Sequence, residues 1–515
     1  MKSTLIKWGL AGIAACGAFS SMAQQINPMT EAVIRNYSDI LAENPKDYIT
    51  LYDRATQYLN IGDLTRALSD IDMALQYTPD KDSDYRLAEL SLKSDILSAQ
   101  KDFNSALKVV EEALKINPSD QTELYKGGNL YLLLNNPSEA LKMFQRLQRE
   151  SPRSQEAFYG MAKANAMMGK TDEAVKLIEE VESLGKQSFV TYCRIGDLYA
   201  DLDKIPEATS NYMIAYSMSE SSRPVESLKL LVKKNPQLVM ESIDKAINDN
   251  SENLALNYVK AIIAYDAGMY NQAEAACVAL AQGLDQPSAA VYRMIALSQL
   301  ALNRVDDAKK SIAQAEAIAP DNGGIILDKA QIYLSDSPEE ALKLAESVLA
   351  KDADNEDNLM LAAKAAILAG KYKEAVSYLN NVILSGPSNV EALLLRGYVN
   401  SDFLKEGKAG VNDYTRASNV KSSGNARELA LTALGKAKIG KKLDADGMIN
   451  DAITKAGNNN DDLYIIAIYF AQTGNLEKAK EFADKAMANG YNNIYNIKTN
   501  NEPLFNLSPI HHLFK

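Results

Sequence analysis

One pattern recurs along most of the 515-residue chain and constrains its fold more than any other feature. One copy, residues 48–79, reads YITLYDRATQYLNIGDLTRALSDIDMALQYTP. It holds two stretches in which apolar residues stand three and four positions apart, a spacing that places them on one face of a helix. Gly62 and Asp63 separate the two stretches, and Pro79 stops the second. Each copy therefore predicts a pair of antiparallel helices.

The register of the copies is marked by an alanine in the second helix. With Ala67 as the anchor, successive anchors follow at a nearly constant spacing, apart from one interval about twice as long. Small residues at the anchor and twelve positions before it let the paired helices approach closely. The later anchors are Ala106, Ala140, Ala174, Ala208, Ala273, Ala308, Ala341, Ala375, Gly410, Ala445 and Ala479. The small residues twelve positions earlier are Ala55, Gly128, Ala162, Gly196, Ala261, Ala296, Ala363, Ala433 and Ala467.

Two repeats carry a large residue, Lys329 and Tyr398, where the earlier small residue is expected. The spacing from the preceding anchor is one residue shorter than usual in the first of these repeats and one residue longer in the second. Moving the expected position by one residue in each repeat places it on Ala330 and Gly397, which are small. The indel seen in the spacing therefore explains the misfit. Glycine also recurs five residues before the anchor, at Gly62, Gly169, Gly268, Gly370, Gly440 and Gly474. Proline recurs twelve residues after it, at Pro79, Pro118, Pro152, Pro320 and Pro387.

This pattern resembles the tetratricopeptide repeat, whose unit is a helix-turn-helix of about 34 residues. The resemblance covers roughly residues 28 to 490, but residues 221–251 fit poorly, and the family's early Trp is absent because the only Trp is Trp8. It implies an all-α fold, a right-handed superhelical α-solenoid of about 12 to 13 helix-turn-helix units. The matched residues of the first copy are Ala55, Tyr58, Gly62, Ala67, Ala74 and Pro79.

The repeats divide the chain into an N-terminal array (24–220), a degenerate repeat or hinge (221–253) and a C-terminal array (254–490). Residues 28–45 look like a leading half-unit, residues 80–85 are expected to form an exposed turn, and Pro224 and Pro236 act as breakers in the degenerate repeat. Residues 491–515 are rich in Asn and carry scattered apolar side chains. We expect this tail to cap the last helix pair, since an end repeat exposes an apolar face.

Residues 1–23 have the pattern of a secretory signal, with Lys2 and Lys7 before an apolar run and a small-residue cleavage site ending at Ala23. A rival interpretation takes residues 13–16 as a lipobox, which would leave Cys16 lipidated and provide the chain's one link to a membrane. We favour cleavage after Ala23, because the apolar segment before Cys16 is short. Both interpretations predict an exported protein, in the periplasm or associated with the outer membrane.

Charge and composition exclude several classes of function. The formal net charge is −12 and no run of Lys or Arg is present, which argues against nucleic acid and anionic membrane surfaces as partners. Cys193 and Cys277 are predicted to be buried free thiols. His511 and His512 are the only histidines, and no nucleophile, phosphate-loop or zinc-protease motif is present. The sequence therefore predicts no enzyme activity, no cofactor and no metal site.

Tyrosine is enriched fifteen residues before the anchor, three residues before the small packing residue of the first helix. In the family that the chain resembles, this flank lines the concave groove, and the opposite flank packs internally. The alternative is that all of these tyrosines pack between repeats. The proposed groove residues are Tyr52, Tyr125, Tyr159, Tyr258 and Tyr464, with Asn129 beside them. Tyr58, Tyr131 and Tyr199 lie on the packing flank.

We therefore predict a non-enzymatic, exported repeat scaffold that binds protein or peptide partners in the cell envelope along an acidic, tyrosine-lined groove. The alternative is a surface lipoprotein that captures glycan or peptide ligands. Glycan sites commonly stack sugars on exposed aromatic rings, and the absence of Trp after Trp8 counts against that alternative.

Overall fold

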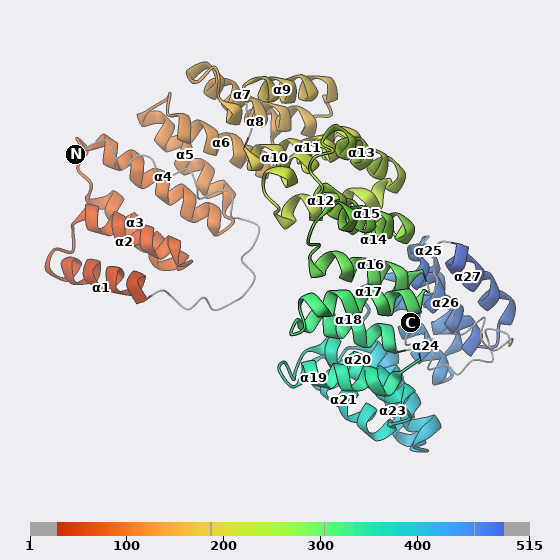
Figure 1. Cartoon of the computed structure of the whole chain (residues 1–515). Coiled ribbons are helices and arrows are strands. Elements are labelled where there is room, and N and C mark those ends of the chain that lie inside the picture. The colour runs from red at the N-terminus through yellow and green to blue at the C-terminus, as the bar shows by residue number, and fades with distance from the viewer. Residues whose placement is uncertain (1–27, 186–187, 303, 335, 458, 489–515) are drawn as a thin grey trace. The chain divides into compact units, whose positions relative to one another are not determined.

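The computed structural model describes residues 28–185, 188–302, 304–334, 336–457 and 459–488. These residues form 27 α-helices and one π-helix, and no β-strand occurs among them. Consecutive helices pack as antiparallel pairs (Figure 1). The prediction of an all-α repeat solenoid is confirmed. The predicted signal sequence (residues 1–23) with Cys16, the predicted capping tail 491–515 and the two histidines lie outside the described residues.

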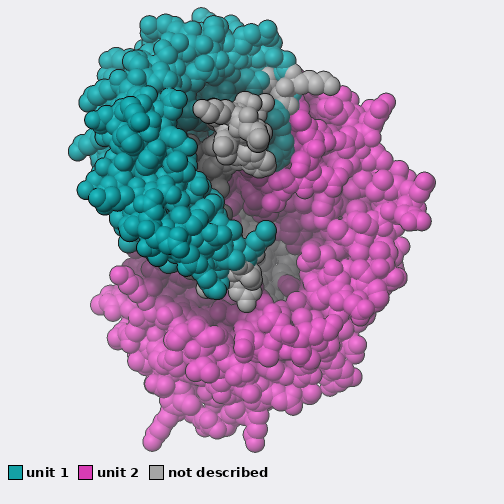
Figure 2. Space-filling view, turned by 90° about the vertical axis from the view of Figure 1, so that its left-hand side faces the viewer, with its two compact units in different colours: residues 1–211 teal, residues 212–515 magenta. Residues whose placement is uncertain are grey.

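The chain divides into two compact units, residues 1–211 and residues 212–515 (Figure 2). The division falls inside one helix, α11 (Ile205–Met218). The other helices of the first unit are α1 (Pro28–Glu43), α2 (Tyr48–Asn60), α3 (Leu64–Tyr77), α4 (Ser83–Ala99), α5 (Phe103–Ile116), α6 (Gln121–Leu133), α7 (Pro137–Glu150), α8 (Gln155–Met167), α9 (Thr171–Ser183) and α10 (Phe189–Asp201).

The second unit continues the same alternation. Its helices are α12 (Ser222–Lys234), α13 (Pro236–Asp249), α14 (Leu256–Asp266), α15 (Tyr270–Gly283), α16 (Ala289–Ala301), α17 (Val305–Ile318), α18 (Gly323–Tyr333), α19 (Pro338–Leu349), α20 (Glu356–Leu368), α21 (Tyr372–Ser385), α22 (Val390–Tyr398), the π-helix (Val399–Phe403), α23 (Gly407–Asn419), α24 (Ala426–Lys438), α25 (Lys442–Ala456), α26 (Asn460–Gln472) and α27 (Leu476–Ala488).

The small residues that set the register form the seam of each helix pair. Every anchor alanine, from Ala67 to Ala479, is fully buried, and Gly410 is buried in the remaining anchor position. The shifted residues Ala330 and Gly397 are buried as well, whereas Lys329 is half-buried. The one-residue shifts inferred from the sequence are confirmed.

In ten repeats the turn between the two helices has a residue in the left-handed region five positions before the anchor. The six glycines predicted there have φ angles of 73° to 81°. Where glycine is missing, Lys101, Asn135, Asp203 and Lys405 adopt φ angles of 54° to 64° at the same position. A residue with a Cβ atom is strained in this region, so this conformation is imposed by the helix pairing on either side.

The repeat with one extra residue before its anchor absorbs that residue in the π-helix Val399–Phe403. A π-helix has i to i+5 hydrogen bonds and accommodates one inserted residue within a helix. The wider turn brings Ser401 against the anchor of that repeat. A Cβ atom on Gly410 would collide with Ser401 Oγ and lie 2.6 Å from the Gly397 carbonyl oxygen. This crowding explains why this anchor is glycine.

Two local expectations are wrong. Residues 80–85 do not form a turn throughout, because α4 begins at Ser83 and extends to Ala99. Pro224 does not break a helix, since it lies in the first turn of α12, where a missing N–H costs nothing. Pro236 does mark a break, because α12 ends at Lys234 and Pro236 is the first residue of α13. The degenerate segment is therefore a pair of helices.

Candidate functional site

The first helices of three successive repeats, α6, α8 and α10, lie next to one another in the first unit. On each helix a set of incompletely buried side chains recurs three and four residues apart, and this set forms one stripe. Together the three stripes make a continuous surface, which we call the α6–α8–α10 surface. Its residues are Thr122, Tyr125, Asn129 and Leu133 on α6, Glu156, Tyr159, Lys163 and Met167 on α8, and Val190, Arg194, Asp197 and Asp201 on α10.

Arg194 joins two of the predicted tyrosines at the centre of this surface. Its guanidinium lies over the ring of Tyr159, 5.3 Å from the centroid, and its Nη2 donates to the Tyr125 hydroxyl at 3.4 Å. All three side chains are half-buried. A half-buried cation–π pair is worth about 0.5–2 kcal/mol, depending on how far it is desolvated. The three side chains therefore hold one another in place while each keeps part of its surface accessible.

A buried phenylalanine supports the cluster from below. Phe144 on α7 is fully buried between α6 and α8, and its ring meets that of Tyr125 edge-on at 6.3 Å. A Cβ atom on Gly128 or Gly160 would collide with ring atoms of Phe144. These two glycines give the ring its space, and the ring in turn fixes the orientation of Tyr125.

Burial dominates the electrostatics of Tyr159. It raises the pKa of the phenol, Asp197 and Asp201 raise it further, and the positive charge of Arg194 opposes them. The hydroxyl thus stays protonated at physiological pH and can donate a hydrogen bond. The Asn129 amide nitrogen donates to the Tyr125 carbonyl oxygen at 3.0 Å, so this group is bound to its own helix.

The other predicted groove tyrosines do not join this cluster. Tyr52 on α2 is half-buried, and its pKa is raised by burial and then by Asp53. Tyr258 on α14 belongs to the second unit and packs against the core around Cys277. Tyr464 contradicts the groove prediction, because it is only 1% exposed and lies inside the core of the second unit. The five tyrosines therefore do not form one continuous row.

The packing flank behaves as expected for two of its three members. Tyr58 and Tyr199 are buried, whereas Tyr131 is half-buried and its hydroxyl donates to Glu111 at 2.9 Å. Cys193 and Cys277 are buried and not disulfide-bonded, as predicted. Burial raises the pKa of the Cys277 thiol to about 12, which leaves it protonated and unreactive.

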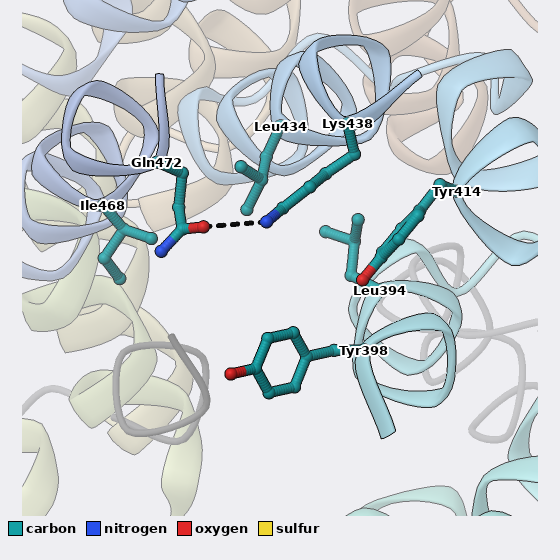
Figure 3. A pocket seen from close by; sticks show the side chains of 7 residues that line it. All are labelled: Leu394, Tyr398, Tyr414, Leu434, Lys438, Ile468 and Gln472. Atoms are coloured by element: carbon teal, nitrogen blue, oxygen red, sulfur yellow. Dashed lines mark hydrogen bonds between the residues drawn. The ribbon is translucent and has the colours of Figure 1, made fainter. Parts of the chain in front are cut away.

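A small hollow lies in the second unit, between α22, α23, α24 and α26 (Figure 3). Leu394, Leu434 and Ile468 line it with apolar surface, and Lys438 Nζ donates to Gln472 Oε1 at 2.8 Å across its edge. Its volume is about 270 Å³ including the part open to solvent, which is below the roughly 300–1,000 Å³ typical of ligand pockets. The hollow is too small to serve as a binding pocket for a drug-sized ligand.

Sequence reasoning missed Arg194 and Lys163. Both were detectable in principle, since Arg194 follows Cys193, which occupies the tyrosine position of its repeat, and Lys163 stands four residues after Tyr159. Over the described part of the chain, no group of three or more His, Cys, Asp or Glu side chains is placed to hold a metal. No helix within the described residues has the length and apolar character needed to cross a membrane.

Three segments match models of the tetratricopeptide repeat family, at residues 90–120, 125–188 and 333–397. The second segment contains Tyr125, Tyr159 and most of the surface described above. The chain is a tetratricopeptide repeat protein. Proteins of this family are in general interaction scaffolds rather than enzymes. The comparison with curated protein sequences finds no match.

Solved structures similar to this tetratricopeptide repeat protein share little sequence with it. A tetratricopeptide repeat protein from Parabacteroides merdae is 17% identical, with 55% of this chain and 98% of that chain covered and a TM-score of 0.31. The Cut9–Hcn1 hetero-tetramer of the APC/C gives 13% identity, 92% and 99% coverage and a TM-score of 0.33. YrrB, described as a TPR protein with an unusual peptide-binding site, gives 19% identity, 41% and 98% coverage and a TM-score of 0.29. The assignment rests on the family models and the repeat register.

Proposed function

We propose that the protein is a non-enzymatic scaffold that binds a protein or peptide partner on the α6–α8–α10 surface. The observation that carries the proposal is the cluster of Tyr125, Tyr159 and Arg194, half-buried and in mutual contact on three successive repeats. Tyrosine and arginine are among the residue types most enriched at the energetic centres of protein interfaces. Because the cluster is already ordered, binding costs little further side-chain entropy.

The location we propose is the cell envelope, with the protein exported by the signal at residues 1–23. The support is the charged start, apolar run and small-residue cleavage site of that segment. Mass spectrometry of the native protein tests this proposal. We expect a mature N-terminus at Gln24, whereas an acylated Cys16 would show a lipid anchor instead, and an intact Met1 would refute export.

The binding role is tested by replacing Tyr125 and Tyr159 together with Ala and capturing partners from envelope extracts. We expect the partners bound by the natural protein to be lost, since truncating an interface tyrosine at an energetic centre costs roughly 2 kcal/mol or more. Tyr85→Ala is the matched control, because Tyr85 is an exposed tyrosine on α4 outside this surface. Unchanged capture by a correctly folded double variant would refute the proposal.

The buried tyrosines should give the opposite result. Tyr58→Ala and Tyr199→Ala remove large buried side chains and should destabilise the fold by about 3 kcal/mol or more, without removing any contact to a partner. Thermal melts and capture assays on both sets of variants give this crossed pattern. Equal destabilisation by the Tyr125 and Tyr159 substitutions would show that these two rings only pack between repeats.

A further inference from the structure

We infer that helix α1 pairs with the α1 helix of a second copy of this chain, so that two copies form a weak antiparallel dimer. The face of α1 that would pair is called the α1 seam, and it consists of Val33, Asn36, Tyr37 and Ile40. None of these residues belongs to the α6–α8–α10 surface. The inference therefore goes beyond the proposed binding role and uses only the mature N-terminus proposed above.

The α1 seam corresponds to positions that the other repeats bury. Val33, Tyr37 and Ile40 occupy, in the repeat frame, the anchor position and the positions four and seven residues after it. In every helix that carries an anchor, from α3 to α27, the residues at these three positions are buried. On α1, Val33 and Tyr37 are half-buried and Ile40 is 41% exposed. Helix α1 is thus the second helix of a repeat that has no first helix among the described residues.

The mature chain cannot cover this seam with the segment that precedes it. Cleavage after Ala23, as proposed above, leaves only residues 24–27 before α1. The first helices α2 and α6 have 13 residues each, so this segment is too short to replace one. The neighbouring face of α1 is already occupied, because Ile34 and Leu41 pack into the core formed with α2 (Figure 1). The seam therefore fits a helix from another molecule.

The distribution of charge on α1 favours a second α1 as that helix. At about 100° per residue, Glu31, Arg35 and Asp39 lie roughly opposite the seam, and all three are exposed. Two seams can therefore meet without like charges facing each other. Antiparallel pairing also opposes the two helix dipoles. It places Glu43, the last residue of α1, beside the N-terminus of the second helix, where a negative charge is stabilising.

A polar residue in the seam defines the register of the pair. Asn36 lies near the middle of the 16-residue α1, so full antiparallel overlap places it at the twofold axis. There its amide faces Asn36 of the second copy, and each amide can donate to the other. In α3 the same repeat position is Asp70, which is 3% exposed and accepts two hydrogen bonds from Arg54. One polar pair within an apolar helix seam is enough to specify register.

The length of α1 determines how strong the association can be. Its 16 residues extend over about 24 Å at about 1.5 Å per residue. One pair of helices of this length buries less than the roughly 1,200 Å² of a stable interface. We therefore expect a reversible dimer with a dissociation constant of roughly 100 µM. Such a dimer carries two copies of the α6–α8–α10 surface, which would raise its avidity for a ligand with two matching sites.

Sedimentation equilibrium tests the inference on the chain made to begin at Gln24, so that the result does not depend on export. We expect a monomer–dimer equilibrium between about 10 and 500 µM chain. Ile40→Lys should weaken it about tenfold or more, because each dimer would then bury two unpaired charges. Leu443→Lys on α25 is the matched control, since Leu443 is 89% exposed. Tyr125→Ala with Tyr159→Ala should also leave dimerisation unchanged. A natural chain that is purely monomeric over this range would overturn the inference.

A disulfide trap tests the register of the pair. Cys193 and Cys277 are buried, so Asn36→Cys introduces an accessible thiol that those two cannot compete with. At the twofold axis the two new thiols lie close enough to form a disulfide when oxidised glutathione is added. Glu31→Cys, on the far side of the helix, should cross-link about tenfold more slowly or less. Adding Ile40→Lys to Asn36→Cys should abolish the cross-link. Equal rates for the two cysteine variants would show that the seam is not the interface.

Other occupants of the seam would give a different result, and melts confirm that each variant folds. If the chain stays monomeric but Ile40→Lys removes a protein captured from envelope extracts, the seam binds a foreign helix and self-association is wrong. If the dimer forms as expected but capture is insensitive to Tyr125 and Tyr159, this inference stands and the proposed binding role fails.

Discussion

Replacing Glu89 with Gln should stabilise the first unit at neutral pH. Glu89 on α4 is fully buried, and its Oε1 lies 2.5 Å from the Thr78 hydroxyl oxygen. That hydroxyl also lies 2.8 Å from the Ala74 carbonyl oxygen. A hydroxyl has one proton, so it cannot donate both to Ala74 and to an ionised Glu89. A protonated Glu89 resolves the conflict, because it donates to Thr78, which then donates to Ala74.

Burial raises the pKa of Glu89, although Thr78 and Arg86 partly oppose the shift. Because the folded-state pKa lies above the unfolded value of about 4.3, the folded protein holds this proton more tightly. Stability from this group is therefore fully present below about pH 4.3 and is lost as pH rises through the raised folded pKa. The Oε2 atom also has no hydrogen-bond partner among the described residues. An unsatisfied buried polar group costs about 1–3 kcal/mol, more when charged.

We therefore expect Glu89→Gln to raise the free energy of opening of α3–α5 by about 1–3 kcal/mol at pH 8 and to have little effect at pH 4. Hydrogen exchange of these helices is the appropriate measurement, since repeat arrays open locally. Glu112→Gln, an exposed glutamate on α5, is the control and should change neither value. If Glu89→Gln lowered the protection of these helices from hydrogen exchange at pH 8, the ionised carboxylate would be required. The reasoning that Glu89 is protonated and donates to Thr78 would then be wrong.

Two glycine substitutions test the packing. Gly160→Ala should destabilise the α6–α8 pair by about 1–3 kcal/mol, because its Cβ would overlap the ring of Phe144; a melt identical to that of the natural protein would show that the ring can move. Gly410→Ala should cost a similar amount through its collision with Ser401 in the π-helix. Deleting Asn400, which removes the extra residue of that repeat, should make the same alanine tolerable. A double-mutant cycle measures the coupling, and additive effects would refute this account of the π-helix.

The repeat architecture could be predicted from the sequence because it depends on local chemistry. Small residues at the helix seam, such as Ala67 and Ala55, and a residue that tolerates positive φ, such as Gly62, are needed in each copy. A one-residue indel shifts these requirements together, so Ala330 and Gly397 could be identified from the sequence alone. How the indel is accommodated was not predictable, since a π-helix depends on hydrogen bonds that leave no residue signature.

Only part of the candidate site could be predicted from the sequence. Position in the repeat fixes the direction in which a side chain points, which is why Tyr125 and Tyr159 were found. It does not fix what the neighbouring repeats place around that side chain. At the same position Tyr464 is buried in the core of the second unit, whereas Tyr159 remains partly exposed beneath Arg194.

Burial and ion pairing depend on residues far away in the chain, as in the hydrogen bond between Arg194 and Tyr125, which joins the first helices of two different repeats. The sequence by itself therefore determined the helix pairs and their register, because both follow from residue spacing within one copy. The tertiary structure decided which tyrosines and cations stay accessible, because accessibility is a property of several repeats packed together.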